Sequence, residues 1–156
     1  MRKAHVSLIV TLSLLAVSAM AEEYTHQESG LTFNLPRGWQ TGQDGDVLTV
    51  ISPDQTVAML FMVTDIDRSD DLVEAVTTEV ESLQDVQLTS EPVIQRVNGL
   101  IQVHAEGIGT CESGEICNWD LTLVTGASKN LLVVALGDIE GHQTAINRVY
   151  TSITAD

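Results

Sequence analysis

Residues 131–136 read Leu-Leu-Val-Val-Ala-Leu, and residues 56–63 read Thr-Val-Ala-Met-Leu-Phe-Met-Val. A strand with one face in water alternates apolar and polar side chains, and neither of these runs does so. Both runs therefore predict strands that are buried on both faces. Such strands need a layer of structure on each side of their sheet, so these two segments decide the fold class.

Two amphipathic helices are available to supply those layers. The first begins near Ser69, with Asp70 and Asp71 in its first turn, and its apolar stripe runs to Leu83. The second spans 143–153. The remaining predicted strands are 31–35, 47–51, 87–96, 100–108 and 118–125. The sequence therefore predicts an α+β fold: a mostly antiparallel sheet of six to seven strands with helices on both faces, an α/β/α sandwich.

Two hairpins are predicted from turn chemistry and cysteine spacing. Asn98-Gly99 is a strong two-residue hairpin signal. Cys111 and Cys117 enclose a short turn, and their spacing is typical of a structural disulfide rather than of a redox-active C-x-x-C pair. If Cys111 faces Cys117 across the hairpin, Gly107 lies opposite Leu121, and the apolar side chains gather on one face.

The first 21 residues have the pattern of a secretory signal peptide. Arg2 and Lys3 are followed by an apolar run over 6–17 and by the small-residue cleavage pattern at 19–21. We therefore expect a signal peptide over 1–21 and a single domain over 22–156, without a transmembrane segment in the mature chain. The predicted location is periplasmic or secreted.

The chain is strongly acidic. It carries 7 basic and 22 acidic residues, for a formal net charge of −15. Loss of Arg2 and Lys3 with the signal peptide leaves five basic residues and a net charge of −17. Such a surface repels nucleic acid and anionic lipid. Two interpretations stay open: adaptation of a secreted protein to its surroundings, or a docking face for a basic partner or for cations.

One motif indicates a family. Gly30, Phe33, Pro36, Gly38 and Trp39 fit the pattern G-x-x-F-x-x-P-x-G-W. Together with the order of elements, this motif resembles the PsbP-like and Ran-binding Mog-type superfamily, including the bacterial periplasmic DcrB-like proteins. The resemblance implies an α/β/α sandwich in a non-catalytic binding or accessory protein of the bacterial envelope, without shared catalytic residues.

Polar residues on two neighbouring strands form the first candidate binding cluster. His104 and Glu106 share one strand face, and Asp120 lies on the next strand. They could line a cleft between a helix and the sheet. Alternatively, they could lie at an open sheet edge or be paired in hydrogen bonds within the fold. No nucleophile accompanies His104, so an enzyme is not predicted.

A weaker metal candidate precedes the first helix, at Asp65, Asp67, Asp70 and Asp71. The positions that an EF-hand reserves for Gly and for a bidentate Glu hold Asp70 and Val76, so that motif fails. The alternatives are a helix start rich in acids and a weak calcium site of another kind. No cofactor is predicted.

These patterns together predict an exported, non-catalytic binding or accessory protein of the bacterial cell envelope. Its partner would be another envelope protein, bound through the acidic surface or an exposed sheet face, and a basic partner would complement that surface. The alternative is a binder of a small ligand or of calcium that uses a cleft between helix and sheet.

Overall fold

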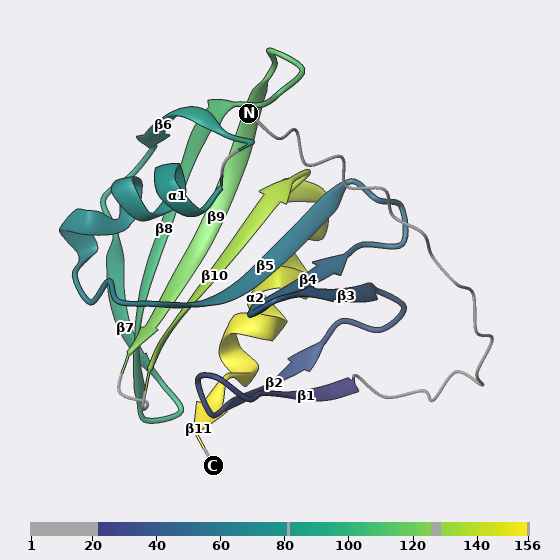
Figure 1. Ribbon diagram of the computed structural model, residues 1–156, viewed down its shortest axis with the longest axis vertical. Coiled ribbons are helices and arrows are strands. Elements are labelled where there is room, and N and C mark those ends of the chain that lie inside the picture. Colours follow the sequence, from purple (N-terminus) through teal and green to yellow (C-terminus); the bar gives the residue numbers. More distant parts are fainter. Residues whose placement is uncertain (1–21, 81, 126–128, 156) are drawn as a thin grey trace.

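The structure is a computed structural model that describes residues 22–80, 82–125 and 129–155 (Figure 1). The predicted signal peptide, residues 1–21, lies outside the described residues. The fold is α+β: mostly antiparallel strands form two sheets, accompanied by two α-helices. The predicted class and antiparallel character are therefore confirmed.

A three-stranded sheet has the order β1-β2-β11. Its strands are β1 (Glu22–His26), β2 (Leu31–Leu35) and β11 (Thr154–Ala155). An eight-stranded sheet has the order β3-β4-β5-β10-β9-β8-β6, with β7 also paired to β8. Its strands are β3 (Gln40–Asp44), β4 (Val47–Ile51), β5 (Val57–Thr64), β6 (Gln84–Leu88), β7 (Val93–Val97), β8 (Leu100–Thr110), β9 (Ile116–Thr125) and β10 (Asn130–Gly137).

The helices are short and each follows a turn of 3-10 helix. The turn η1 (Ser69–Asp71) leads into α1 (Leu72–Glu79), and η2 (Glu140–His142) leads into α2 (Gln143–Ser152). Helix α1 ends four residues before Leu83, where its predicted stripe stops. Leu83 is nevertheless buried, because the chain beyond the helix continues along the same core.

The prediction of one sheet with six to seven strands is wrong. Strand β2 leaves the main sheet and pairs with β1 and β11. Strand β3 is absent from the predicted strands, because its side chains show no alternation of apolar and polar residues. All five of its residues are exposed. Backbone hydrogen bonds hold β3 to β4. Such bonds leave no hydrophobic pattern in the sequence, so the strand could not be predicted from one.

The predicted strand 87–96 is divided into β6 and β7. Both pair with β8, and they lie one after the other along the same edge. Pro92 falls in the break between them. Proline has no N–H for the ladder and is tolerated at such an edge, so it marks the point of division.

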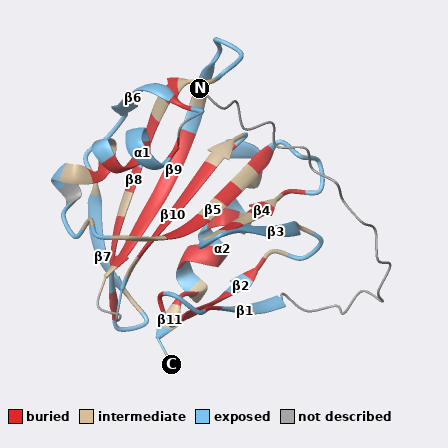
Figure 2. Ribbon diagram, in the orientation of Figure 1, coloured by how far each residue is buried: buried red, intermediate tan, exposed pale blue. Residues whose placement is uncertain are grey.

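The buried side chains form two hydrophobic clusters, and residues of β10 alternate between them. Leu131, Val133 and Ala135 belong to the first cluster, and Leu132 and Val134 belong to the second; all five are fully buried. Figure 2 shows β10 and its neighbours β5 and β9 as the most buried part of the sheet. The expectation that residues 131–136 are covered on both sides is thus met over 131–135.

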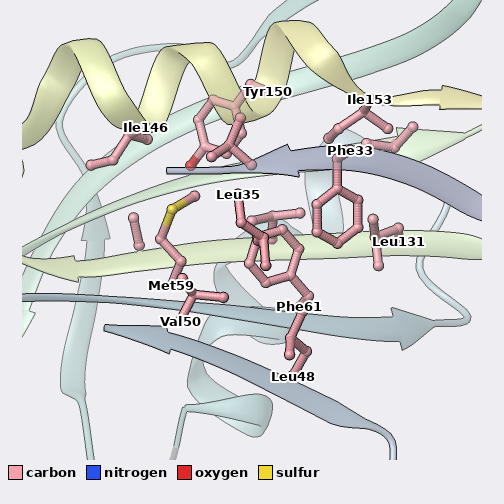
Figure 3. Packing of buried hydrophobic residues seen from close by; sticks show 14 of the residues in the cluster. Phe33, Leu35, Leu48, Val50, Met59, Phe61, Leu131, Ile146, Tyr150 and Ile153 are labelled. Carbon is pink, nitrogen blue, oxygen red and sulfur yellow. The ribbon is translucent and has the colours of Figure 1, made fainter. Parts of the chain in front are cut away.

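Each helix contributes to one of these clusters. Ile146, Val149 and Tyr150 of α2 lie in the first cluster with the apolar side chains of β2 (Figure 3). Leu72, Ala75 and Val76 of α1 lie in the second cluster.

An aromatic contact joins the two sheets within the first cluster. The rings of Phe33 and Phe61 are stacked with their centroids 4.5 Å apart. The small sheet is therefore anchored on the large one through its apolar face.

The register between β8 and β9 differs from the prediction by two residues. Gly107 lies opposite Trp119, not opposite Leu121. The Cys111 N–H donates to the Glu115 carbonyl, so the ladder closes around a three-residue loop. Gly114 adopts a φ of 84° there, a conformation that glycine reaches without strain. The tighter turn shifts every pair by two positions but keeps each side chain on its predicted face.

The corrected register explains why residue 107 is glycine. A Cβ at Gly107 would overlap the Trp119 indole and the backbone carbonyl of Gln87. Trp119 is almost fully buried, and its Nε1–H donates to the Ile108 carbonyl at 3.0 Å, so the ring has little freedom to move. The missing side chain makes room for the largest residue of the second cluster.

We predict that Gly107→Ala destabilises the protein by about 3 kcal/mol, because overpacking a well-filled core displaces a buried ring and backbone. Urea unfolding measures the change. The matched control is Gly42→Ala, where a Cβ meets no atom within 4 Å; it should shift the free energy of unfolding by less than about 1 kcal/mol. Equal effects of the two substitutions would contradict the packing.

Candidate functional site

The predicted polar cluster is built around a buried carboxylate. Asp120 is 1% exposed, and its Oδ1 accepts hydrogen bonds from the Tyr150 hydroxyl at 2.7 Å and from His104 Nε2 at 3.0 Å. The structure therefore brings together His104 and Asp120, two residues of the predicted polar cluster. Glu106 pairs with Asp120 across the ladder, but its side chain is exposed.

These contacts change the proton affinities of two groups. The hydrogen bond to Asp120 is the main reason that the pKa of His104 is raised, and the charge of Glu106 acts in the same direction. Burial is the main reason that the pKa of Tyr150 lies well above its usual value, and the Asp120 charge adds to it. Tyr150 therefore stays a hydrogen-bond donor to Asp120 throughout the physiological range.

The carboxyl end of α2 is fixed to the sheet beside this cluster. Gln102 Nε2 donates to the Tyr150 carbonyl at 2.8 Å, and Asn98 Nδ2 donates to the carbonyls of Thr151 and Ile153 at 2.8 and 3.0 Å. The last carbonyls of a helix have no partner inside the helix, so these amides satisfy them. Asn98 thus serves both the predicted Asn98-Gly99 hairpin and the docking of α2.

Two buried oxygens of the cluster have no hydrogen-bond partner among the described residues. They are Asp120 Oδ2 and Gln102 Oε1. His104 is partly accessible, with 27% of its side chain exposed, but it lines neither of the two cavities considered below. The cluster is a hydrogen-bonded link between the sheet and α2, and a binding role for His104, Glu106 and Asp120 stays a prediction.

Tyr150 lies in the predicted helix 143–153, but the sequence prediction did not include it in this cluster. A buried tyrosine hydroxyl needs a hydrogen-bond partner. Asp120 is the acidic residue of the predicted strand 118–125 and is the natural acceptor. The need of the hydroxyl for an acceptor, and of the buried carboxylate for a donor, could have indicated this pair. The sequence did not show that α2 brings Tyr150 to Asp120 on β9.

A second feature is an acidic cleft of about 820 Å³ beside α1. It lies between the helix, the loop that follows β5 and the start of β10. Its carboxylates are Asp65, Asp67, Asp71, Glu74 and Glu79.

The loop on one side of this cleft is held in place. Asn130 Nδ2 donates to the Ile66 carbonyl at 3.0 Å, and the Ile66 N–H donates to Thr64 Oγ1 at 3.2 Å. Lys129 also lines the cleft, and its ammonium group forms an ion pair of 3.2 Å with Glu28.

The four predicted metal ligands do not act as one set. Asp65, Asp67 and Asp71 line the acidic cleft, whereas Asp70 forms an ion pair of 3.2 Å with Arg68. Within the described part of the chain, no group of three or more His, Cys, Asp or Glu residues is arranged to hold a metal ion. Metal binding by these aspartates therefore stays a prediction that would need the loop to rearrange.

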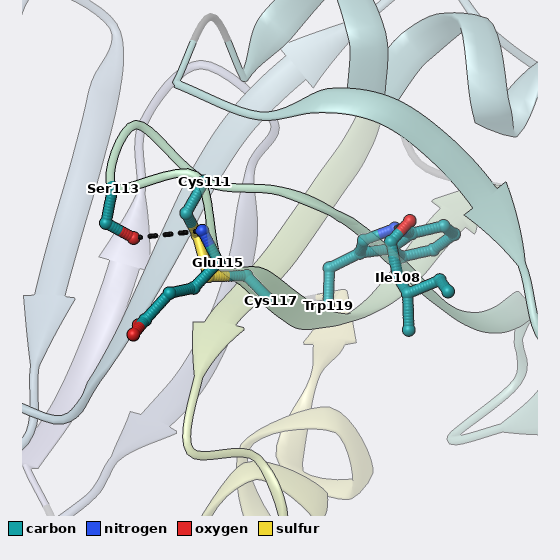
Figure 4. Close-up of a disulfide and its surroundings, with 6 residues drawn as sticks. All are labelled: Ile108, Cys111, Ser113, Glu115, Cys117 and Trp119. Atoms are coloured by element: carbon teal, nitrogen blue, oxygen red, sulfur yellow. Dashed lines mark hydrogen bonds between the residues drawn. A yellow bond between two sulfur atoms is a disulfide. The ribbon is translucent and has the colours of Figure 1, made fainter.

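The predicted disulfide is present. Cys111 and Cys117 are bonded, with their Cα atoms 5.8 Å apart, at the end of the β8–β9 hairpin (Figure 4). In the same turn the Glu115 N–H donates to Ser113 Oγ at 3.3 Å. Both half-cystines pack against the second cluster near Trp119, so the bond closes the hairpin over the core.

Solved structures of proteins from several bacteria have the same fold as this chain. The cyanobacterial PsbP (CyanoP) of Synechocystis is 12% identical with a TM-score of 0.66, and the match covers 94% of this chain and 99% of that protein. LpqN of Mycobacterium tuberculosis, described as involved in cell envelope biogenesis, is 14% identical with a TM-score of 0.54, covering 86% and 90%.

A Bacteroides thetaiotaomicron protein is 13% identical with a TM-score of 0.60. The match covers 87% of this chain but 48% of that protein, so this chain spans about half its length. No family model and no curated protein sequence matches the chain. The fold is thus PsbP-like, in agreement with the predicted resemblance.

Across the residues that the structure describes, neither helix has the length and apolar character needed to cross a bilayer.

We predict that Tyr150→Phe lowers the free energy of unfolding by about 1.5–3 kcal/mol, because a buried carboxylate loses a hydrogen-bond donor. The matched control is Tyr24→Phe, whose hydroxyl donates at 3.4 Å to the exposed Gln43; it should cost less than about 0.5 kcal/mol. Urea unfolding of the three proteins checks this. A loss at Tyr150 no larger than that at Tyr24 would show that the buried bond adds no stability.

The raised pKa of His104 sets the sign of a pH effect. The folded protein holds this proton more tightly than the unfolded chain, so the stabilisation is complete below a pH of about 6.5 and is lost as pH rises through the folded pKa. We expect His104→Gln to destabilise the protein more at a pH of about 5.5 than at about 8.5. Other titrating groups, such as the buried His26, are present in both proteins and cancel. A stability difference that widens with pH would refute this assignment.

Proposed function

We propose that this chain is an exported, non-catalytic accessory protein of the bacterial cell envelope that binds a basic segment of another envelope protein. The observation that carries the proposal is the acidic cleft beside α1. A cleft of about 820 Å³ can enclose long side chains of a partner, and its lining has one sign of charge apart from Lys129.

The electrostatics of the cleft favour a cationic partner. Asp65 and Asp67 approach from the loop, and Glu74 and Glu79 approach from the helix. Like charges lining one concave surface reinforce each other and attract an oppositely charged ligand. Since Lys129 is engaged with Glu28, it does not neutralise this set. Lysine or arginine side chains of a partner would restore the balance.

Apolar side chains on the same sheet face offer an additional contact. Ile94 is 67% exposed and pairs with Val103, which belongs to the second cluster with α1. Ile101 is 40% exposed and lies two residues before Val103, so it points to the same side. Exposed apolar residues beside a charged region are typical of protein-binding surfaces.

The comparisons support an accessory role. LpqN is described as involved in cell envelope biogenesis, and the CyanoP structure shows that a PsbP is built on the same fold. The intramolecular disulfide supports export, since such bonds persist in oxidising compartments.

The α/β/α sandwich is part of this proposal. Successive side chains of β10 point to opposite sides of the sheet. Because they alternate between the two clusters, the helix in each cluster would cover a different face. In this arrangement α2 shares its layer with the small sheet, whereas α1 leaves the cleft and the isoleucines open to a partner.

We predict that neutralising the cleft with Asp67→Asn, Glu74→Gln and Glu79→Gln abolishes capture of the partner from a bacterial envelope extract. The exported protein serves as bait, and mass spectrometry identifies what is retained. The wild type should enrich one envelope protein, less strongly as salt rises from about 0.05 to about 0.3 M, because ions screen exposed charges.

The matched control is a triple variant with the same change of net charge, Glu91→Gln, Glu112→Gln and Glu115→Gln, at exposed positions outside the cleft. It should retain the partner. If both variants lost the partner equally, the effect would come from net charge alone and the proposed site would be wrong. If millimolar calcium, but not sodium at equal ionic strength, raised the melting temperature of the wild type and not of the cleft variant, calcium binding would replace protein binding as the function.

A further inference from the structure

A second cavity of about 610 Å³ lies at the motif that carries the family resemblance. Leu35 lines it from the end of β2, Pro36 and Trp39 line it from the segment after that strand, and Val149 lines it from α2. Cavities of this size commonly hold small organic molecules. The cavity is distinct from the acidic cleft, and the two share no lining residue.

The rim of this cavity is basic, although the protein is strongly acidic. Arg37 and Arg148 both line it, and they are two of the five basic residues in 22–156. None of the described residues that line it is acidic. Two arginines from separate elements therefore converge on one cavity in a chain that has few cations to place.

The other three basic residues all have partners, whereas these two arginines have none among the described residues. Arg68 pairs with Asp70, Lys129 pairs with Glu28, and Arg96 donates to the Gly99 carbonyl at 3.3 Å. Within residues 22–80, 82–125 and 129–155, the guanidinium groups of Arg37 and Arg148 have no hydrogen-bond or ion-pair partner. The chain has 22 acidic residues, yet no described carboxylate lies at this rim.

The wall of the cavity is held in position before any ligand arrives. Gly38 has a φ of 77°, and the Trp39 N–H donates to the Pro36 carbonyl at 3.3 Å, which closes a tight turn. The Trp39 ring meets the His142 ring edge-on, with centroids 5.5 Å apart. His142 is in turn held by Thr56 Oγ1 at 2.9 Å and by Asp54 Oδ2 at 3.1 Å.

We propose that this cavity binds a small organic carboxylate with an apolar body. The carboxylate would lie between Arg37 and Arg148, whose planar guanidinium groups match its two oxygens. The apolar body would lie against Trp39 and Leu35, which offer an aromatic and an aliphatic surface. A bare inorganic anion would leave that apolar wall unused.

The two tryptophans make the site testable by NMR. Trp39 lines the cavity, whereas Trp119 is buried in the second cluster and serves as an internal control. The exported protein, labelled with nitrogen-15, is titrated with phenylpropionate, with its neutral amide phenylpropionamide and with inorganic phosphate. We expect phenylpropionate to shift the Trp39 indole resonance saturably and to leave that of Trp119 unchanged, with no comparable effect of the amide or of phosphate.

The double variant Arg37→Gln with Arg148→Gln removes the rim charges at two exposed positions. It should raise the Kd for phenylpropionate at least about tenfold, since charged hydrogen bonds are lost. The control, Arg68→Gln with Arg96→Gln, removes the same charge elsewhere and should bind like the wild type. An unchanged Trp119 resonance shows that each variant is folded.

Three results would overturn the proposal. They are an unmoved Trp39 resonance at millimolar phenylpropionate, binding of the amide as tight as that of the acid, and wild-type affinity in the Arg37/Arg148 variant. Tight binding of phosphate without phenylpropionate would also reject the ligand class. None of these results bears on the acidic cleft, so the two proposals fail independently.

Discussion

The complete burial of β10 is the constraint on which the rest of the structure depends. Its central residues, 131–135, alternate between two hydrophobic clusters. A strand in this position cannot be exposed on either side without leaving large apolar side chains in water. The first cluster is filled by β2 and α2, and the second by α1 and the chain that follows it. Both helices, and the separation of the small sheet from the large one, follow from this demand.

In the β8–β9 hairpin, the local geometry of the turn sets the register of the whole pair of strands. The turn at Gly114 pairs Cys111 with Glu115, whereas the cysteine spacing alone suggested that Cys111 lies opposite Cys117. As a result Gly107, rather than Gly109, provides the space for Trp119. Because a shift of two residues preserves the alternation of side chains, apolar sorting cannot distinguish the two registers. The turn geometry decides between them.

The polar groups have two different roles in this architecture. Asp120, Tyr150 and His104 are joined to one another and hold α2 against the sheet, so their chemistry is used for cohesion. The carboxylates of the acidic cleft and the arginines of the second cavity instead face open space, and most of them are not neutralised by a neighbour. These concave surfaces of opposite sign lie at separate positions, and they are the sites that we propose for a basic partner and for a small organic carboxylate.

Much of the fold could be determined from the sequence alone. The apolar runs at 56–63 and 131–136 identified the central strands, Asn98-Gly99 identified a hairpin, and Cys111 and Cys117 identified the disulfide. These features depend on the periodicity and on the turn chemistry of neighbouring residues. The sequence also placed His104 and Asp120 on neighbouring strands, but the hydrogen bond between them depends on the register that the structure shows.

The tertiary structure alone decided which distant segments meet. Strand β3 has no hydrophobic signal, and Tyr150 reaches Asp120 only because α2 crosses β9. Arg37 and Arg148 are 111 positions apart and come together because α2 packs against β2. Such contacts are set by how the apolar faces of whole elements fit together, and local sequence patterns carry no record of that fit.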